Sequence, residues 1–534
     1  MQGLMQRHEL LISSILEHAD RHHGDGEVVS RRTDGSLART SYGALAKRAR
    51  RLATVLRALS VKPGDRVGTL AMNSDRHVEL YYAISGTGAV CHTINPRLSH
   101  DDVAYIIAHA EDGLVFCDSA FLPILAAVAP GLAGILRNIV VLTDAADMPA
   151  ADLPAGMALH CYETLLADAE EQEAWPLFDE NAASALCYTS GTTGRPKGVL
   201  YSHRSTLLHT MVNLAPDALG ARATDRILAV VPMFHVNAWG LPYLAPMAGA
   251  ALLLPGRQLD PASLVALMND ERATLAVGVP TIWLGLLNHL RDTGGKLETL
   301  KRVFVGGAAL PRAMITQFAR HGIEARQGWG MTESSPVVTV NAPKPSCLRL
   351  EEDARLDRRA KQGRCLFGVD VRAEGEDGAE MHQGIAGNIV FRGHWIASGY
   401  YRMPLSEGAW FPTGDVGMID DQGFVLLTDR SKDLIKSGGE WISSIAIENI
   451  AMEHPDVAEA AAIAVPHEKW GERPLLIVVP RPGCAPAPEA LREFCRGRMP
   501  DWSIPDSVVI ADSLPHGATG KILKTELRRM YAAG

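Results

Sequence analysis

Short apolar runs recur along the first 310 residues, and helical stretches separate them. The runs lie at 67–71, 227–231, 250–254, 275–279 and 303–305. Several carry no polar residue at alternate positions, and a strand of that kind is covered on both faces. Residues 41–60 place Leu52, Val55, Leu56 and Leu59 on one helical face, with Lys and Arg opposite. Strands and amphipathic helices that alternate in this way predict an α/β architecture.

Length, charge and cysteine spacing narrow the class of protein. A chain of 534 residues is long for one domain, so two or three are expected. The formal net charge of -9 argues against a protein that coats nucleic acid, because that role needs a basic face. The eight cysteines include no CxxC pair, which favours buried thiols in a reducing compartment over disulfides or a zinc site.

Neither the N-terminus nor the most apolar stretch has the pattern of a targeting or membrane segment. The first 24 residues carry charge throughout and lack the long apolar core of a signal peptide. The most apolar stretch, 113–136, is interrupted by Asp118, Pro123 and Pro130, so buried strand and helix segments are expected there. We therefore predict a cytoplasmic protein without an integral membrane segment.

The pattern of the sequence changes past residue 380. Short β-like pieces joined by Gly- and Asp-rich turns lead to a second, smaller α/β pattern from about residue 431. The smaller pattern predicts helices at 444–453 and 488–499 and strands at 460–465, 475–479 and 507–511. About a hundred residues is an ordinary size for a small domain. We predict a large domain over residues 1–428, a hinge at 429–434 and a C-terminal domain over 435–534.

Residues 188–198 read YTSGTTGRPKG and are dense in groups that bind phosphate. Glycines let backbone N–H groups approach an anion, the hydroxyls donate hydrogen bonds, and Lys197 adds a positive charge. A P-loop requires Gly-Lys followed by Ser or Thr at the start of a helix, whereas Lys197 lies between Pro196 and Gly198. A polar surface turn has a similar composition, so the loop alone leaves two interpretations open.

The loop resembles the phosphate loop of the adenylate-forming superfamily, which includes acyl-CoA synthetases, peptide-synthetase adenylation domains and luciferases. Further motifs follow in family order: VPMFHVNAW (231–239), GGAALP (306–311), QGWGMTE (327–333), WFPTGDVG (410–417), DRSKDLIKSGGEWIS (429–443) and PHGATGKILK (515–524). In these motifs the chain is most similar to medium- and long-chain fatty acyl-CoA synthetases and to 3-(methylthio)propionyl-CoA ligases. The resemblance implies a large domain of two α/β subdomains plus a small β-barrel-like subdomain, and a small mobile α+β C-terminal domain.

The resemblance implies two half-reactions with ATP and coenzyme A as co-substrates and Mg²⁺ as the metal. A carboxylate attacks the α-phosphate of ATP to give an acyl-adenylate and pyrophosphate, and a thiol then displaces AMP. Both reactants of the first step are anionic, so the site must offer cations and N–H donors and align the two groups.

Roles carry over position by position from the family motifs. Thr189 and Glu333 match the pair that binds Mg²⁺. The residues that embrace the β- and γ-phosphates match Ser190, Gly191, Thr192, Thr193, Gly194 and Lys197. Those that line the adenylate match Gly307, Ala308, Gln327, Gly328, Trp329, Gly330 and Thr332, with the Trp329 ring near the adenine. Asp415 and Arg430 match the ribose contacts, and Lys432 follows them in the linker motif.

Lys521, in ATGK, matches the C-terminal lysine that contacts the substrate carboxylate and the α-phosphate. It lies far along the chain from the phosphate loop, so the small domain must close over the large one by rotation at Asp429-Arg430. Lys521, Lys197, Glu333 and Thr189 form the predicted catalytic set. The rotation also implies a thioester face, where Lys436, Gly438 and Trp441 match CoA contacts.

The acyl site matches His235, Val236, Trp239 and Gly307, and Trp239 resembles the indole that gates a fatty-acid tunnel. This segment favours a medium- to long-chain fatty acid. Close relatives with nearly the same segment act on small acids such as 3-(methylthio)propionate, and an aromatic acid is a further alternative.

Other functions within and outside the superfamily stay open. An enzyme that acylates a carrier protein and a luciferase-like oxygenase share the motifs. A non-catalytic nucleotide-binding scaffold is the alternative from another class, although the intact Lys197, Glu333 and Lys521 argue against it. The resemblance also implies a homodimer, which is common among similar synthetases.

Overall fold

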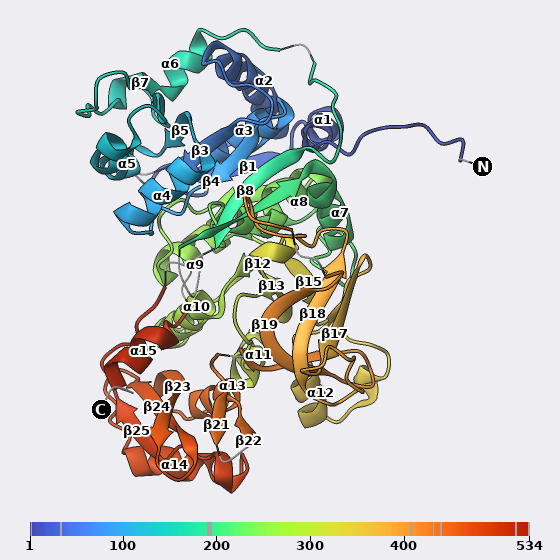
Figure 1. The fold of residues 1–534 in the computed structure, drawn as a ribbon, viewed down its shortest axis with the longest axis vertical. Coiled ribbons are helices and arrows are strands. Elements are labelled where there is room, and N and C mark those ends of the chain that lie inside the picture. Colours follow the sequence, from blue (N-terminus) through green and yellow to red (C-terminus); the bar gives the residue numbers. More distant parts are fainter. Residues whose placement is uncertain are drawn as a thin grey trace.

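The computed structural model describes residues 1, 3–32, 35–172, 174–189, 195–405, 408–430, 432–437, 440–517 and 521–531, with 440 and 441 described for the backbone only. Within these residues, four sheets and their helices form a large N-terminal part and a smaller C-terminal part (Figure 1). The predicted α/β class, with a large and a small domain, is confirmed.

The first large sheet has the strand order β7-β6-β5-β3-β4-β8-β9. Its pairs are parallel except for β8 and β9, which are antiparallel. The strands are β3 (Arg66–Leu70), β4 (Val90–Thr93), β5 (Leu114–Cys117), β6 (Asn138–Val141), β7 (Ala158–Cys161), β8 (Ala183–Thr189) and β9 (Lys197–Ser202).

The second large sheet has the order β16-β15-β14-β13-β12-β10-β11-β1-β2, with a parallel centre and antiparallel edges. Its strands are β1 (Glu27–Arg31), β2 (Leu37–Ser41), β10 (Arg226–Ala229), β11 (Ala251–Leu254), β12 (Leu275–Gly278), β13 (Arg302–Val305), β14 (Glu324–Gly330), β15 (Val337–Val340) and β16 (Arg364–Cys365).

Both large sheets are buried on both faces, as the apolar runs predict. In β11, Leu252 and Leu254 join one hydrophobic cluster and Leu253 joins the cluster on the opposite face. The covering helices are α1 (Ile12–His23), α2 (Tyr42–Ala58), α3 (Asp75–Gly86), α4 (His100–Ala110), α5 (Leu122–Val128), α6 (Tyr162–Ala167), α7 (His203–Asn213), α8 (Leu241–Ala248), α9 (Pro261–Asp270), α10 (Pro280–Thr293), α11 (Arg312–Arg320) and α12 (Glu352–Arg359).

Two predicted segments have the structure that the sequence indicates. The helix predicted over 41–60 is α2, and the Ser41 hydroxyl caps it by accepting a hydrogen bond from the Ala44 N–H at 3.3 Å. The apolar stretch 113–136 divides into β5, α5 and two short 3₁₀ turns, one on each side of α5. Among the described helices, none is both long and apolar enough to cross a membrane.

A four-stranded antiparallel sheet with the order β17-β18-β19-β20 follows, and a mixed sheet with the order β22-β21-β24-β23, with β25 beside β24, forms the C-terminal part. These strands are β17 (Val369–Glu374), β18 (Gly387–Gly393), β19 (Phe411–Ile419), β20 (Val425–Arg430), β21 (Ile435–Ser437), β22 (Glu440–Ile442), β23 (Val457–His467), β24 (Gly471–Pro480) and β25 (Ser507–Ile510). The helices are α13 (Ser444–Met452), α14 (Pro488–Cys495) and α15 (Lys524–Tyr531). The helix predicted over 488–499 ends earlier, at Cys495, and Gly497 follows with a φ of 74°.

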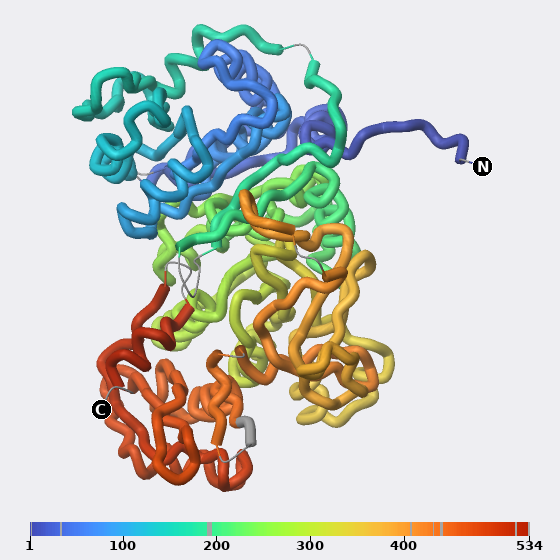
Figure 2. Tube along the Cα trace, viewed as in Figure 1, coloured from blue at the N-terminus to red at the C-terminus, as the bar shows by residue number. Residues whose placement is uncertain are grey.

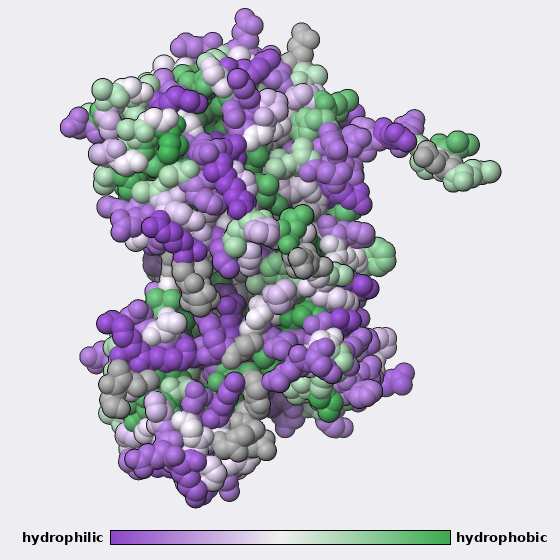
Figure 3. Space-filling view, viewed as in Figure 1, coloured by the Kyte–Doolittle hydropathy of each residue, from purple (hydrophilic) through white to green (hydrophobic). Residues whose placement is uncertain are grey.

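The C-terminal part contacts the large part at several places among the described residues, including the bond from the Ser444 N–H to the Asp429 carboxylate at 2.7 Å. The Arg481 guanidinium donates to the Asn288 side-chain oxygen on α10 at 2.8 Å. The segment before α15 leaves the C-terminal part and extends toward the middle of the large part (Figure 2). Hydrophilic side chains cover most of the visible face, and hydrophobic ones form scattered small groups (Figure 3).

Candidate active site

The predicted site residues of the large part gather at the carboxyl ends of parallel strands. The predicted acyl segment, residues 231–239, follows β10, the turn with Gly306 and Gly307 follows β13, and Gln327 to Gly330 end β14. Thr189 ends β8 of the neighbouring sheet. Ligands of open α/β sheets bind at this edge, so the strand order alone brings these motifs together.

The acyl segment has an unusual backbone. Val236, Asn237, Ala238 and Trp239 have φ values of 46°, 53°, 49° and 55°, so four consecutive residues other than glycine are left-handed. Each such residue costs about 1–2 kcal/mol, and strain of this kind persists only where surrounding contacts impose it.

Asn237 supplies contacts that hold this turn. Its side-chain oxygen lies 3.2 Å from the Tyr81 hydroxyl and accepts from the Cys187 thiol at 3.4 Å. The Tyr81 hydroxyl also contacts the Met233 carbonyl. Because Cys187 lies on β8, two residues before Thr189, the acyl turn is joined to the strand that leads into the phosphate loop.

Trp239 closes one side of the site. Its side chain is 8% exposed and packs edge-on against Phe304, with ring centroids 6.3 Å apart. A Cβ atom at Gly306 would lie 2.8 Å from the indole, so only glycine leaves room for it. A cavity of about 10 Å³, room for about one water, lies beyond the turn and is lined by Thr206, His209, Asn237, Tyr243 and others.

Lys521 reaches this turn from the C-terminal part. A Cβ atom at Gly307 would lie 3.8 Å from Lys521 Cε and 3.9 Å from the Trp239 ring. The Gly517 N–H donates to the Lys521 carbonyl at 2.7 Å, and His516 and Ile522 pair as an isolated antiparallel bridge. The structure therefore joins the C-terminal lysine to the acyl and nucleotide motifs, more than 200 residues away in the chain.

Helix α15, which begins at Lys524, anchors the Lys521 segment to the C-terminal part. The Lys524 ammonium lies 2.6 Å from the Glu448 carboxylate on α13. Arg528 donates to Asp433, in the linker, at 2.6 Å. The Ser444 backbone N–H donates to the Asp429 carboxylate at 2.7 Å.

The surroundings of the site lower the pKa of two basic side chains. His235 is therefore neutral at neutral pH, and Lys521 titrates close to neutral pH. Loss of hydration and the Arg430 guanidinium lower the pKa of Lys521 to about 8, while Asp415 and Glu333 act in the opposite direction. The Lys521 side chain is exposed to solvent, so water moderates this shift. Burial, and secondarily the charge of Lys521, lowers the pKa of His235 to about 4.

Asp415, Arg430 and Trp329 form a second group. Asp415 and Arg430 are directly opposed in β19 and β20, and Arg430 Nε lies 3.3 Å from Asp415 Oδ1. The Trp329 indole N–H donates to Asp415 Oδ2 at 3.0 Å. Burial raises the pKa of Asp415, and Arg430 and the Trp329 N–H counteract this. A carboxylate has about four acceptor positions, so hydroxyl donors can still bind to Asp415.

Glu333 and Lys197 share one neighbour, Tyr400. The Glu333 side chain is 4% exposed and its Oε1 accepts from the Tyr400 hydroxyl at 2.7 Å. Lys197 Nζ lies 4.9 Å from the centroid of the same tyrosine ring. The carboxylate of Glu333 and the hydroxyl of Thr189 are hard oxygen ligands, and Mg²⁺ commonly takes one or two carboxylates together with substrate phosphates. The residues present therefore fit a magnesium ion bound with nucleotide.

Glycines shape the segment that is predicted to line the adenylate. A Cβ atom at Gly330 would lie 1.7 Å from the Pro336 carbonyl oxygen, and one at Gly328 would lie 2.3 Å from the Phe304 ring. Gln327 Oε1 accepts from the Leu310 N–H at 3.3 Å and so ties β14 to the turn after β13. Ala308 is exposed in that turn, and the Thr332 carbonyl accepts from the Tyr201 hydroxyl at 2.6 Å.

Some predicted residues lie elsewhere or outside the description. Lys432 is exposed in the linker, and Lys436 lies on β21. Ser190, Gly191, Thr192, Thr193, Gly194 and Gly438, together with the Trp441 side chain, lie outside the described residues.

Two residues at the site were not singled out from the sequence. Tyr400 is one of two adjacent tyrosines in SGYYRMP, and Asn237 is one polar residue in an apolar segment. Neither has a local signal, because their partners Glu333 and Tyr81 are 67 and 156 residues away.

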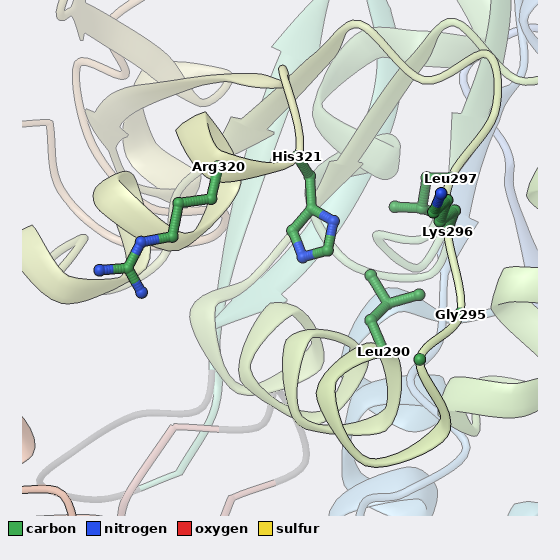
Figure 4. A pocket seen from close by; sticks show the side chains of 7 residues that line it. Leu290, Gly295, Lys296, Leu297, Arg320 and His321 are labelled. Atoms are coloured by element: carbon green, nitrogen blue, oxygen red, sulfur yellow. The ribbon is translucent and has the colours of Figure 1, made fainter.

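A larger cavity, about 420 Å³, lies apart from these groups. It is lined by Leu290, Gly294, Gly295, Lys296, Leu297, Arg320 and His321, at the carboxyl ends of α10 and α11 (Figure 4). Val279, which neighbours Gly307, precedes the opposite end of α10, and a helix of 14 residues is about 21 Å long. The cavity holds no carboxylate and is not part of the site.

The chain matches two models of one enzyme family. Residues 16–401 match the AMP-binding enzyme model, and residues 446–521 match the AMP-binding enzyme C-terminal domain. The chain therefore belongs to the AMP-binding enzyme family.

Full-length relatives define the class more narrowly. A 3-methylmercaptopropionyl-CoA ligase of Ruegeria lacuscaerulensis is 48% identical over 99% of this chain and 98% of its own. A medium-chain-fatty-acid–CoA ligase of Ectopseudomonas oleovorans is 46% identical over 99% and 98%, and a long-chain-fatty-acid–CoA ligase of Thermus thermophilus is 45% identical over 99% and 96%.

Solved structures agree with the fold. An anthranilate CoA ligase in complex with anthranoyl-AMP has a TM-score of 0.88 at 22% identity and covers 99% of both chains. ATP-bound MatB from Rhodopseudomonas palustris has a TM-score of 0.80 at 27% identity over 98% of this chain and 99% of its own. The prediction of an ATP-dependent, AMP-forming acyl-CoA synthetase is confirmed.

Proposed function

We propose that this chain joins a carboxylic acid to coenzyme A in two steps, through an acyl-adenylate held between its two parts. The observation that carries the proposal is the position of Lys521, which comes from the C-terminal part and lies beside Gly307 and Trp239 of the large part. Asp415, Arg430 and Glu333 act electrostatically on the same lysine. A cation placed here is suited to two anionic reactants, a carboxylate and the α-phosphate of ATP.

In the adenylation step, Lys521 would hold the acid's carboxylate and the α-phosphate together, which lowers their mutual repulsion and aligns them. Asp415 and Arg430 would hold the ribose hydroxyls, with Trp329 kept in place by Asp415. Lys197 and the loop before it would hold the outgoing phosphates. Glu333 and Thr189 would hold Mg²⁺, which supplies positive charge to the phosphates when it is bound.

In the thioester step, the C-terminal part would rotate about residues 429–434 and withdraw Lys521. The break between β20, which ends at Arg430, and β21, which begins at Ile435, supports a hinge here. Lys436, Gly438 and Trp441 would then face the CoA thiol. A homodimer stays a prediction from the resemblance, and a cytoplasmic location stays a prediction from the composition and the N-terminal segment.

For the acid, we propose a medium- to long-chain fatty acid as the first candidate. Its chain would have to displace the Trp239 indole, because that ring fills the space beside Gly306. A small acid such as 3-(methylthio)propionate is the second candidate, since only a cavity of about 10 Å³ lies beyond the turn while the indole is in place. The relatives named for fatty acids and for 3-methylmercaptopropionate support both candidates.

The test is a panel of acids, from propionate to palmitate with thioether and aromatic acids, incubated with ATP, Mg²⁺ and CoA. AMP, pyrophosphate and acyl-CoA should form in equal amounts. Pyrophosphate exchange into ATP without acyl-CoA would favour a carrier protein as the acceptor. Nucleotide binding without turnover of any acid would favour the scaffold.

A further inference from the structure

Tyr400 occupies a fixed position between the two groups predicted to handle metal and phosphate. It lies in the segment between β18 and β19, and main-chain hydrogen bonds hold that segment on both sides of it. The Ala397 N–H donates to the Glu333 carbonyl at 2.8 Å, and the Tyr401 N–H donates to the Gly198 carbonyl at 2.8 Å. The segment is thereby attached to the turn that carries Glu333 and to the strand that carries Lys197.

The hydroxyl group and the ring of Tyr400 make different interactions. Its hydroxyl donates to Glu333 Oε1 at 2.7 Å, and its ring lies beneath the Lys197 ammonium at 4.9 Å. The ring also packs edge-on against Phe411, with centroids 6.1 Å apart. A hydrogen bond to a carboxylate and a cation–π contact are both directional enough to orient the charged groups.

The arrangement keeps opposite charges apart. Within the part of the chain that the structure describes, no ion pair within 4.0 Å joins Glu333 to Lys197, and Tyr400 supplies the hydroxyl donor to the buried Glu333 carboxylate. If Glu333 and Lys197 formed an ion pair, the negative charge of Glu333 would no longer be free for the metal. The positive charge of Lys197 would likewise be neutralised and lost to the phosphates. The tyrosine hydroxyl binds Oε1 of Glu333, and a carboxylate has a second oxygen that can bind a cation.

We propose that Tyr400 is a positioning residue that holds Glu333 ready for the metal and keeps Lys197 separate from it. This inference rests on the proposed function, because it takes Glu333 to be the metal ligand. Its consequence is specific. Loss of the hydroxyl should weaken the effect of Mg²⁺ on ATP binding, whereas loss of general packing would weaken ATP binding with or without the metal.

The test measures equilibrium binding of ATP by calorimetry, without acid and without CoA, so that no turnover occurs. Each protein is titrated once with Mg²⁺ present and once with EDTA, and the ratio of the two dissociation constants gives the metal's contribution. In Tyr400→Phe, which keeps the ring, we expect this ratio to fall about tenfold, the range for a hydrogen bond to a charged group. Binding in EDTA should change by less than about twofold, which also verifies the fold.

Tyr401→Phe is the matched control, because Tyr401 contacts the Arg402 guanidinium and the His109 ring instead. Its ratio should equal that of the wild type. Glu333→Gln should lose the metal effect, and adding Tyr400→Phe to it should cause no further loss, since the hydroxyl acts through Glu333.

Two results would overturn the proposal. One is a Tyr400→Phe ratio equal to the wild-type ratio, and the other is an equal loss of affinity with and without Mg²⁺. A wild-type protein that binds ATP with no metal effect would instead overturn the assignment of Glu333, and with it the metal part of the proposed function.

Discussion

Replacing Lys521 by alanine should separate the two half-reactions. Lys521 is the cation beside Gly307 and Trp239, whereas Arg430 is held at 3.3 Å by Asp415 and Lys197 lies over the Tyr400 ring. Neither remaining cation can take its place without giving up its own partner. Removal of one preorganised group that stabilises developing charge costs about a hundred- to a thousandfold in rate, and we expect a loss of that size in adenylation.

The assay follows each half-reaction separately. Adenylation is measured as pyrophosphate exchange into ATP in the presence of acid, and thioester formation is measured from supplied acyl-adenylate and CoA. The second rate should change by less than about threefold, because Lys521 is withdrawn in that step. Lys301→Ala is the matched control: Lys301 is exposed and precedes β13, at the opposite end of that strand from Gly306.

Two outcomes would refute this reasoning. Equal losses in both half-reactions would contradict the rotation of the C-terminal part. An adenylation rate that stays within tenfold of the wild type would contradict the role of Lys521, although its position next to Gly307 would remain.

Three further predictions concern pH, the acyl site and stability. The pKa of Lys521 is lowered to about 8, and adenylation requires the charged form. The value of kcat/KM for adenylation should therefore fall about tenfold per pH unit above pH 8. The Lys521→Arg enzyme should be slower but should not show this fall, because arginine stays charged. Trp239→Gly should raise kcat/KM for dodecanoate relative to butyrate about tenfold, and an unchanged ratio would mean that the indole does not limit chain length. Asn237→Ala should lower the free energy of unfolding by about 2 kcal/mol, measured from the first urea transition, because it removes a buried hydrogen-bond acceptor and leaves alanine at a φ of 53°. Asn181→Ala, at an exposed position, should cost less than about 0.5 kcal/mol in the same assay.

The sequence by itself determined the α/β class and most of the residues placed at the site. Apolar runs such as 250–254 report burial on both faces, because neighbouring side chains of a strand point to opposite sides. Motif order named Lys521, Glu333 and Asp415, because groups that handle charged reactants need particular chemical types at particular spacings. The sequence did not reveal where the helix that starts at Pro488 ends. Helix ends depend on local backbone geometry, as at Gly497.

Only the tertiary structure decided which side chains meet. Tyr400 and Glu333 are 67 residues apart and Trp329 and Asp415 are 86 apart, and no local pattern specifies either pair. The left-handed backbone from Val236 to Trp239 opposes the intrinsic preference of those residues, and contacts such as those of Asn237 with Tyr81 and Cys187 hold it. Periodicity and motifs indicate whether a residue is buried and what chemical type it needs to be. Strand order and domain position determine which distant residue becomes its contact partner.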